Sequence, residues 1–425
     1  MRKLFGNRTV MSWALYDWAN SSFATTVMAG FFPLFFQLYW SKGADPAVTT
    51  AKLGTTVSIA SFAIAILAPF LGAAADLRGL KKKFLFVFCV GGVIFSASLG
   101  FVPQGEWLSA AITYGAALLC FTATIVYYDS LLPSVAKGNE DEVSAFGFGL
   151  GYLGGGILLA INVLMMQRPA LFGFESEVQG ILASFISVAI WWAVFSIPLF
   201  LYVPEPGLGV STPSETHIFT KIFEGTKKTL STVSGTLGKI KSNRNLFTFL
   251  IAYWLYIDGV YTVITMAVNH GVAIGLKPAA LITALLITQF IGFPSALVFG
   301  KVARPFGCKK PILFAILVYF LVVIYSVFLE TELEFLILAA VIGLVQGGVQ
   351  ALSRSLFSRM IPSELSAEYF GFFNLIGKFA SIVGPAIVAI GAYVTGSSRY
   401  GILGLLVLFI LGGTLLLTVK EQAHQ

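Results

Sequence analysis

The stretch YDWANSSF (Tyr16–Phe23) places a carboxylate, an amide and two hydroxyls at the start of an apolar run that continues through Ala24–Trp40. An apolar run of this length predicts a helix that crosses the membrane. Asp17 would then lie within the bilayer, where a charged side chain costs roughly 2.5–3.5 kcal/mol. Such a charge indicates either a group that binds a transported solute or proton, or a buried ion pair that fixes helix packing.

The composition of the whole chain is that of a polytopic membrane protein. Hydrophobic residues make up 57% of it and charged residues 11%, whereas a soluble domain is about half apolar and a quarter charged. Apolar runs of about 20 residues recur along the length, which excludes a soluble domain with one anchor. The three scattered cysteines predict no disulfide framework, and the first apolar run is too long for a cleavable signal peptide.

Charged, Pro-rich and Gly-rich breaks divide the chain into candidate helices. Twelve are expected, at about 10–40, 51–75, 83–103, 107–135, 143–167, 180–203, 246–270, 278–300, 310–330, 334–361, 367–396 and 399–419. They predict an all-α fold of two pseudo-symmetric six-helix bundles, 1–203 and 246–425, joined by a linker at 204–245. In the linker, apolar residues recur at helical spacing between lysines over 218–240. This pattern predicts an amphipathic helix on the cytoplasmic membrane surface, which tethers the halves while they move, or alternatively a site for a regulatory partner.

The positive charges favour one orientation in the membrane. With the N-terminus inside, 21 Lys and Arg fall on the cytoplasmic side and 5 outside, with Lys378 left within a helix. This imbalance predicts that both termini are cytoplasmic, and it explains the net charge of +7 without a nucleic-acid partner.

The two halves repeat sequence features in the same order. GAAADLRGLKKK (Gly72–Lys83) follows the second helix and GKVARPFGCKK (Gly300–Lys310) follows the eighth, with two glycines seven residues apart in each. The fourth and tenth helices both end at a proline, and the first and seventh carry Asp17 and Asp258. Internal repeats of this kind are typical of secondary transporters.

Gly72–Lys83 resembles motif A of the major facilitator superfamily, with an Asp four residues after the first Gly and basic residues after the second. Leu77 and Leu80 occupy positions that are usually basic in that motif. The resemblance implies a cytoplasmic latch in which Asp76 and the basic cluster, here Arg78 and Lys81, join helices across the halves in one state. The alternative is a tight glycine turn whose lysines only set the topology.

Four further blocks are similar to one branch of the superfamily: YDWANSSF (16–23), AYWLYIDGVYT (252–262), GGVQALSRSLFSRMIP (347–362) and FGFFNLIGKFASIVGP (370–385). That branch includes the fungal vacuolar amino-acid effluxer linked to autophagy and many bacterial members without an assigned substrate. The resemblance implies a twelve-helix secondary transporter, with export of amino acids as the activity carried over.

Ionisable residues inside the predicted helices are the candidates for substrate binding, coupling and gating. In the superfamily, helices 1, 4, 7 and 10 line a central cavity, and here they carry Asp17, Asp129, Asp258 and Arg354. Lys378 on the eleventh helix needs a counter-charge, because a buried unpaired charge is untenable, and we expect Asp17 or Asp258 to provide it. Asp129 and Arg354 lie near the inner helix ends and could form a cytoplasmic gate pair.

Neutral polar residues in the helices could add hydrogen bonds to a polar solute; the main ones are Tyr16, Asn20, Tyr256 and Asn374. Such residues also join membrane helices to each other, at about 0.6 kcal/mol each on average. No nucleophile–base pattern predicts an enzyme, no His/Cys cluster predicts a metal site, and no Gly-rich phosphate loop predicts a nucleotide or other cofactor.

The sequence therefore predicts a transporter of a small polar solute, an amino acid or similar zwitterion, that works by alternating access and proton coupling. The alternatives are an uncoupled facilitator, a carrier of an amphiphilic, lipid-like, sugar or peptide substrate, and a non-transporting membrane sensor or scaffold. The expected partners are membrane lipid, a small-molecule substrate and protons. We expect a monomer in a bacterial inner membrane.

Overall fold

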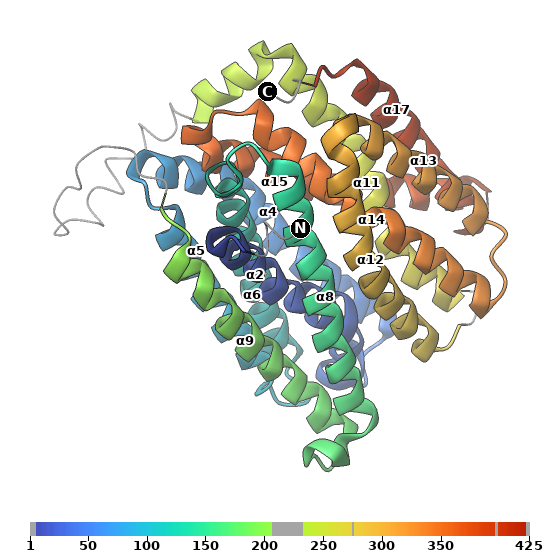
Figure 1. Ribbon diagram of the computed structural model, residues 1–425. Coiled ribbons are helices and arrows are strands. Elements are labelled where there is room, and N and C mark those ends of the chain that lie inside the picture. The colour runs from blue at the N-terminus through green and yellow to red at the C-terminus, as the bar shows by residue number, and fades with distance from the viewer. Residues whose placement is uncertain (1–5, 206–232, 274–275, 396–397, 422–425) are drawn as a thin grey trace.

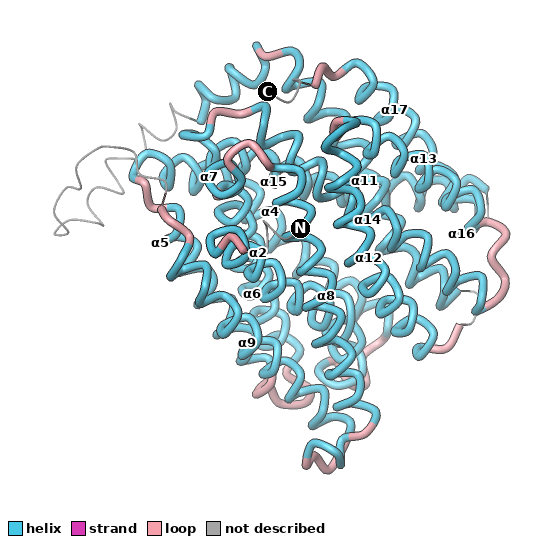
Figure 2. Tube along the Cα trace, in the orientation of Figure 1, coloured by secondary structure: helices cyan, strands magenta, loops and turns pink. Residues whose placement is uncertain are grey.

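Helices make up the fold throughout the described part of the chain. The computed structural model describes residues 6–205, 233–273, 276–395 and 398–421, except for the side chains of a few helical residues, among them 77–78 and 378–382. Figure 2 shows helices joined by short loops. Ten of the described helices are long and apolar enough to cross a membrane, and two shorter apolar helices, Val383–Thr395 and Ile402–Thr418, lie where the last two spans were predicted. The predicted all-α, twelve-helix membrane fold is confirmed.

The main helices of the first half begin and end close to the predicted limits. They are α2 (Arg8–Ser22) with its continuation to Trp40, α4 (Pro46–Arg78), α5 (Lys81–Leu99), α6 (Trp107–Ser130), α8 (Glu140–Gln167) and α9 (Glu177–Tyr202). Those of the second half are α11 (Arg244–Ala273), α12 (Pro278–Phe306), α13 (Lys309–Ser326), α14 (Glu332–Met360), α15 (Ser366–Thr395) and α17 (Leu405–Thr418). Of the predicted amphipathic helix, residues 233–242 are helical and residues 218–232 lie outside the described part.

Polar residues at helix starts explain several of these limits. Asn7 accepts hydrogen bonds from the backbone amides of Thr9 and Val10 and so caps α2, and Ser176 does the same for α9. The first span differs from the expected regular helix, because Phe23–Phe31 (η1) winds as a π-helix. π-Helical turns are frequent at functional sites, and this one lies beside the central cavity described below.

Buried apolar side chains form two separate cores, one in each half of the chain. The first comes from residues 10–203 with Ala367, and the second from residues 240–419. Figure 1 shows the blue-to-green and yellow-to-red halves largely side by side. The bundle limits 1–203 and 246–425 stay a prediction, which the two cores support.

The halves meet mainly along two helix pairs, α4 with α15 and α8 with α12, and α14 also packs on α8. Gly72 of α4 lies so close to α15 that a Cβ there would be 2.2 Å from the carbonyl oxygen of Ala367. On α8, a Cβ at Gly156 would be 2.9 Å from Gln289 of α12. Glycine at these positions lets the backbones approach closely, which is how membrane helices maximise packing without a hydrophobic driving force.

In the first half, end contacts join the third helix to the sixth. The Lys82 ammonium at the start of α5 donates to the carbonyl oxygens of Phe200 (2.9 Å) and Val203 (2.5 Å) at the end of α9. In return, the Glu205 carboxylate accepts a hydrogen bond from the Lys82 backbone amide at 2.9 Å. Each charge therefore satisfies free backbone groups and complements the helix dipole.

The second half has the same arrangement at its third and sixth helices. The Lys309 ammonium donates to the carbonyl oxygens of Leu417 and Val419, both at 3.0 Å. The Glu421 carboxylate accepts from the backbone amides of Cys308 (2.5 Å) and Lys309 (3.2 Å). The recurrence of this capping supports the repeat predicted from the sequence. We call the end of the bundle that carries these contacts, where α9 ends and α11 begins, the linker end.

Candidate functional site

A polar cavity of about 440 Å³ lies between the two halves. Its lining comes from helices of both halves and combines charged groups, carboxamides and tyrosines with apolar side chains. The polar lining includes Asp17, Asn20, Asp129, Tyr152, Tyr261, Gln289, Gln346, Gln350, Arg354 and Asn374. A concave site with a few convergent polar groups is the usual form of a small-molecule site.

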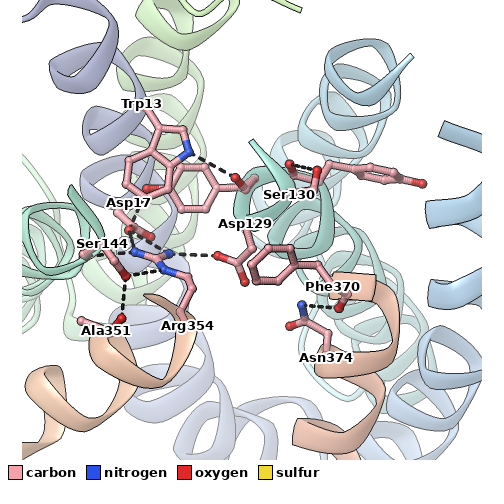
Figure 3. Close-up of polar contacts among 11 residues, drawn as sticks. Trp13, Asp17, Asp129, Ser130, Ser144, Ala351, Arg354, Phe370 and Asn374 are labelled. Atoms are coloured by element: carbon pink, nitrogen blue, oxygen red, sulfur yellow. Dashed lines mark hydrogen bonds and ion pairs between the residues drawn. The ribbon is translucent and has the colours of Figure 1, made fainter. Parts of the chain in front are cut away.

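Arg354 of α14 lies between two carboxylates of the first half (Figure 3). One guanidinium nitrogen donates to Asp129 of α6 at 2.9 Å, and another approaches Asp17 of α2 at 3.4 Å. The remaining donors reach Ser144 of α8, whose hydroxyl and carbonyl oxygens lie at 2.9 and 3.0 Å. Arg354 is 2% exposed, so these partners compensate a charge that is almost fully withdrawn from water.

Aromatic side chains hold the Asp17 side of this site. Tyr128 donates its hydroxyl to the Asp17 carboxylate at 2.8 Å, and Trp13 donates its indole N–H to the Tyr128 carbonyl at 3.1 Å. The Trp13 and Tyr128 rings stack with centroids 4.4 Å apart. The Arg354 guanidinium also lies 4.2 Å from the ring centroid of Phe148, a cation–π contact.

The charges of these three residues do not balance, because two carboxylates face one guanidinium. Asp129 has the shorter ion pair, which makes it the principal counter-ion of Arg354. Asp17 has the longer contact with Arg354 and also accepts the Tyr128 hydroxyl at 2.8 Å. Lys378 lies on α15 near the lining residue Gly377, but its side chain is outside the described residues.

Several predicted site residues lie away from the cavity. Tyr16 is fully buried, and its hydroxyl has no hydrogen-bond partner among the described residues. The Tyr256 hydroxyl lies 2.6 Å from that of Ser353, a contact between α11 and α14. Neither residue lines the cavity, whereas Asn20 and Asn374 do, and Asn374 donates to the Phe370 carbonyl at 3.0 Å (Figure 3).

The contacts of Asp258 indicate that it joins two helices. Its carboxylate accepts the backbone amide of Gly384 at 2.9 and 3.0 Å and the hydroxyl of Thr262 at 3.3 Å. Gly384 precedes Pro385, which lacks an N–H and disturbs the helix around it. Asp258 therefore binds a backbone amide beside the proline within α15, and it is not among the residues that line the cavity. The predicted pairing of Lys378 with Asp17 or Asp258 lies outside the described residues and stays a prediction.

The predicted latch residue Asp76 connects α4 to the start of α15. Its carboxylate accepts the backbone amides of Ala367 at 3.2 Å and Glu368 at 2.7 Å, and it pairs with the Lys81 ammonium at 2.8 Å. Lys81 also donates to the Ser366 hydroxyl at 2.8 Å. The anion thus lies at the positive end of the α15 dipole. The side chain of Arg78, the third predicted latch residue, is outside the described residues.

A second polar cluster between the halves was missed by sequence reasoning. Asp141, in the first turn of α8, accepts a hydrogen bond from Ser355 at 2.5 Å, pairs with Arg359 and accepts the thiol of Cys308 at 2.9 Å. The three consecutive acids Glu140–Glu142 at a helix start were the available signal. No sequence signal marked Ser144 and Tyr128, the partners of Arg354 and Asp17, because a single hydroxyl in a membrane helix more often only joins helices. Within the described part of the chain, no group of three or more His, Cys, Asp or Glu side chains could hold a metal ion.

Comparison with known proteins gives a family match over nearly the whole chain. Residues 6–140 and 137–424 match the family described as "Vacuole effluxer Atg22 like". The chain is 38% identical over 415 residues to the uncharacterized MFS-type transporter YxiO of Bacillus subtilis, which covers 97% of this chain and 94% of that protein. It is 24% identical to autophagy-related protein 22-1 of Penicillium rubens over 93% of this chain and 86% of the relative.

Solved structures of major facilitator transporters share the fold. The transporter FucP in the outward conformation matches with a TM-score of 0.67 and 12% identity, over 98% of this chain and 99% of that one. The proton:xylose symporter XylE bound to 6-bromo-6-deoxy-D-glucose matches with a TM-score of 0.70 and 13% identity, over 98% and 96%. At such low identities these matches show the fold alone.

Proposed function

The chain belongs to the Atg22-like vacuole effluxer family, and from this premise we propose that it is a proton-coupled transporter of a small polar solute. It is a multi-pass membrane transporter of the major facilitator type. We further propose that the protein works by alternating access, that its substrate is an amino acid or similar zwitterion, and that it functions as a monomer. We place it in a bacterial inner membrane with both termini cytoplasmic.

The observation that carries this proposal is the Arg354 site at the edge of the polar cavity. Its ion pairs cross from one half to the other, since Arg354 belongs to α14 and its carboxylate partners to α2 and α6. With the latch at Asp76 and the cluster at Asp141, they favour a state in which the linker end is closed. Alternating access then requires these contacts to break when the halves rock the other way.

The binding and release of a proton at Asp17 can drive this change between the closed and open states. With Asp17 neutral, Arg354 and Asp129 form a balanced pair and the closed contact is stable. Loss of the proton leaves two anions beside one cation, which weakens the closed state and favours opening. A conformational equilibrium that differs in proton affinity between its states is coupled to the proton gradient by linkage.

A zwitterionic solute fits the same groups. The carboxamides and tyrosines of the cavity supply neutral donors and acceptors, and the two aspartates attract an amine. A substrate carboxylate can compete with Asp17 or Asp129 for Arg354 in the planar, bidentate manner that guanidinium groups favour. Substrate binding would then loosen the contact that closes the linker end, which links solute occupancy to the conformational change.

Uptake by reconstituted liposomes tests this function. We expect a pH gradient to accelerate flux of a radiolabelled amino acid, and Asp17→Asn to remove the acceleration. Glu106→Gln is a matched control, because Glu106 is exposed, lies outside the cavity, and its carboxylate contacts Ser109 of the same helix start, so the same acid-to-amide change there leaves the Arg354 site intact. Wild-type flux that does not change with the pH gradient would instead indicate an uncoupled facilitator.

An amphiphilic substrate is a second candidate, favoured by one observation. A more apolar cavity of about 210 Å³ shares Ala24, Thr25, Ile264, Gln289 and Gln346 with the polar one. It would accommodate an apolar group attached to a polar head. A thermal-shift screen of the purified protein against amino acids, peptides, sugars and lysolipids separates the candidates, since stabilisation by lysolipid alone would favour the amphiphile.

A further inference from the structure

Glu368, in the first turn of α15, is a buried carboxyl group that no hydrogen bond of normal geometry satisfies. The residue is 0% exposed, and within the described part of the chain neither carboxyl oxygen has a partner at normal hydrogen-bond geometry, although the Thr236 hydroxyl is directed toward it. The buried acids Asp17, Asp76, Asp129 and Asp258 all have such partners. Buried polar groups are nearly always hydrogen-bonded, so this exception needs an explanation.

The surroundings of Glu368 disfavour a negative charge. Its own backbone amide is held by Asp76 of α4, which places a second carboxylate nearby. The Lys81 ammonium is committed to Asp76 and to the Ser366 hydroxyl, both at 2.8 Å. Among the described residues, the cation that attracts Glu368 is the exposed Lys239. Other titratable groups around this cluster are Tyr127 on α6, Glu364, and Tyr369 on α15 itself.

The linker covers this carboxyl group. Residues 233–242 form a helix that lies next to the start of α15 (Figure 1). Its Thr236 is 2% exposed and directs its hydroxyl toward the Glu368 carboxyl group, and its Lys239 attracts that group electrostatically. Ile240 of the same helix belongs to the core of the second half. Glu368 is therefore enclosed by the latch on one side and by the linker on the other.

A desolvated carboxyl group that lies beside a second carboxylate and is only weakly satisfied by hydrogen bonds favours the neutral acid. Separation of α4 from α15 would remove Asp76 and admit water, and the acid would then ionise as an exposed glutamate does. We propose that Glu368 is a proton-binding site of the latch, loaded while the linker end is closed and emptied to that side when it opens. The proposal rests on the alternating access of the proposed function and is separate from the Asp17 site.

The direction of the effect follows from linkage. The open state binds fewer protons than the closed state at Glu368, so a rise in pH on the linker side favours opening. A single proton changes the opening equilibrium by at most roughly tenfold per pH unit, between the titration ranges of the open and closed states. Glutamine has the shape of the neutral acid and cannot ionise, so Glu368→Gln would keep the latch closed at every pH.

The reactivity of Cys308 is a suitable readout, because this thiol is 0% exposed and contacts Asp141 across the halves at the linker end. In full-length protein in nanodiscs, Cys89→Ala and Cys120→Ala leave Cys308 as the single cysteine. Its rate of labelling by a water-soluble maleimide would be measured from pH 6 to 8.5 with and without Glu368→Gln. The intrinsic titration of the thiol is common to both proteins and cancels in the ratio of rates.

We expect this ratio of parent to Glu368→Gln labelling to rise by several-fold across that range. A constant ratio would overturn the proposal. Lys239→Gln provides a second variant at an exposed position that does not threaten folding. Loss of this cation strengthens proton binding in the closed state, so the rise should extend to higher pH, and an unchanged profile would count against the site.

The labelling assay uses neither a substrate nor a gradient. A protein without solute flux but with pH-dependent labelling would contradict the proposed transport and leave this site standing. Proton-coupled flux with a constant labelling ratio would contradict the Glu368 site and leave the proposed transport standing.

Discussion

Arg354 and Asp129 form a 2.9 Å ion pair that joins α14 to α6 across the two halves of the molecule. Both residues are almost fully buried, at 2% and 4% exposure, so the pair operates where electrostatic interactions are strong and unpaired charges are costly. The contact is available only while the halves are close together at the linker end.

Asp129→Asn should favour opening of the linker end. The substitution removes the principal counter-ion of Arg354, and Asp17 must then lose its proton to replace it. We expect Cys308 labelling in the single-cysteine protein to increase roughly tenfold or more, which corresponds to about 1.4 kcal/mol or more. Unchanged labelling together with unchanged flux would remove Asp129 from the gate.

Gly147→Ala should disturb the Asp17 site while leaving its charges in place. A Cβ at this position of α8 would lie 2.7 Å from the Asp17 carboxylate and 2.8 Å from the Trp13 ring. Overpacking of this kind costs about 1–3 kcal/mol, so we expect a lower Tm and impaired coupling. Gly54→Ala is the matched control, since a Cβ there has nothing within 4 Å. Equal effects of the two variants would refute close packing as the reason for glycine at 147.

Asp258→Asn should reduce stability more than coupling. The carboxylate caps the Gly384 amide, and replacing it with an amide weakens a buried charge-assisted bond, at a cost of about 1–3 kcal/mol. We expect a lower Tm by scanning fluorimetry, with proton-driven flux retained per folded molecule. A variant with the Tm of the wild type and no response to the gradient would instead identify Asp258 as the coupling residue.

Glu421→Gln should destabilise the second half. Its carboxylate caps the start of α13, and the loss of such a cap typically costs about 0.5–2 kcal/mol. Glu175→Gln, the same change at an exposed position, is the control. A Tm equal to that of the control would show that the cap contributes little.

Much of the fold was accessible from the sequence, because membrane helices must be long, apolar and bounded by charged or Gly/Pro-rich loops. The Asp129–Arg354 contact was expected too, since both residues lie near the inner ends of helices that line the cavity. The proximity of Asp17 to the same arginine was not expected from the sequence. It depends on the rotation of α2 and on the close approach of α8 at Gly147, which no residue pattern along a single helix encodes.

The distinction between Asp17 and Asp258 also required the structure. Both are acids in matching helices of the repeat, yet one lines the cavity and the other binds a backbone amide of α15. The signal for the second role was the Gly384–Pro385 pair, because a proline inside a helix disturbs the backbone hydrogen bonds around it. The weakly satisfied Glu368 could not be recognised from the sequence, because an acid in the first turn of a helix is ordinarily a favourable and solvated group.

The central claim is that Asp17 couples solute movement to a proton, and solute-induced proton movement tests it most directly. In weakly buffered liposomes containing the protein, addition of a transported solute should change the pH of the medium, and the change should disappear with an uncoupler. Asp17→Asn should abolish this pH change while solute exchange between the two sides continues. A pH change of unaltered size in Asp17→Asn, or solute flux without any pH change in the wild type, would contradict the account.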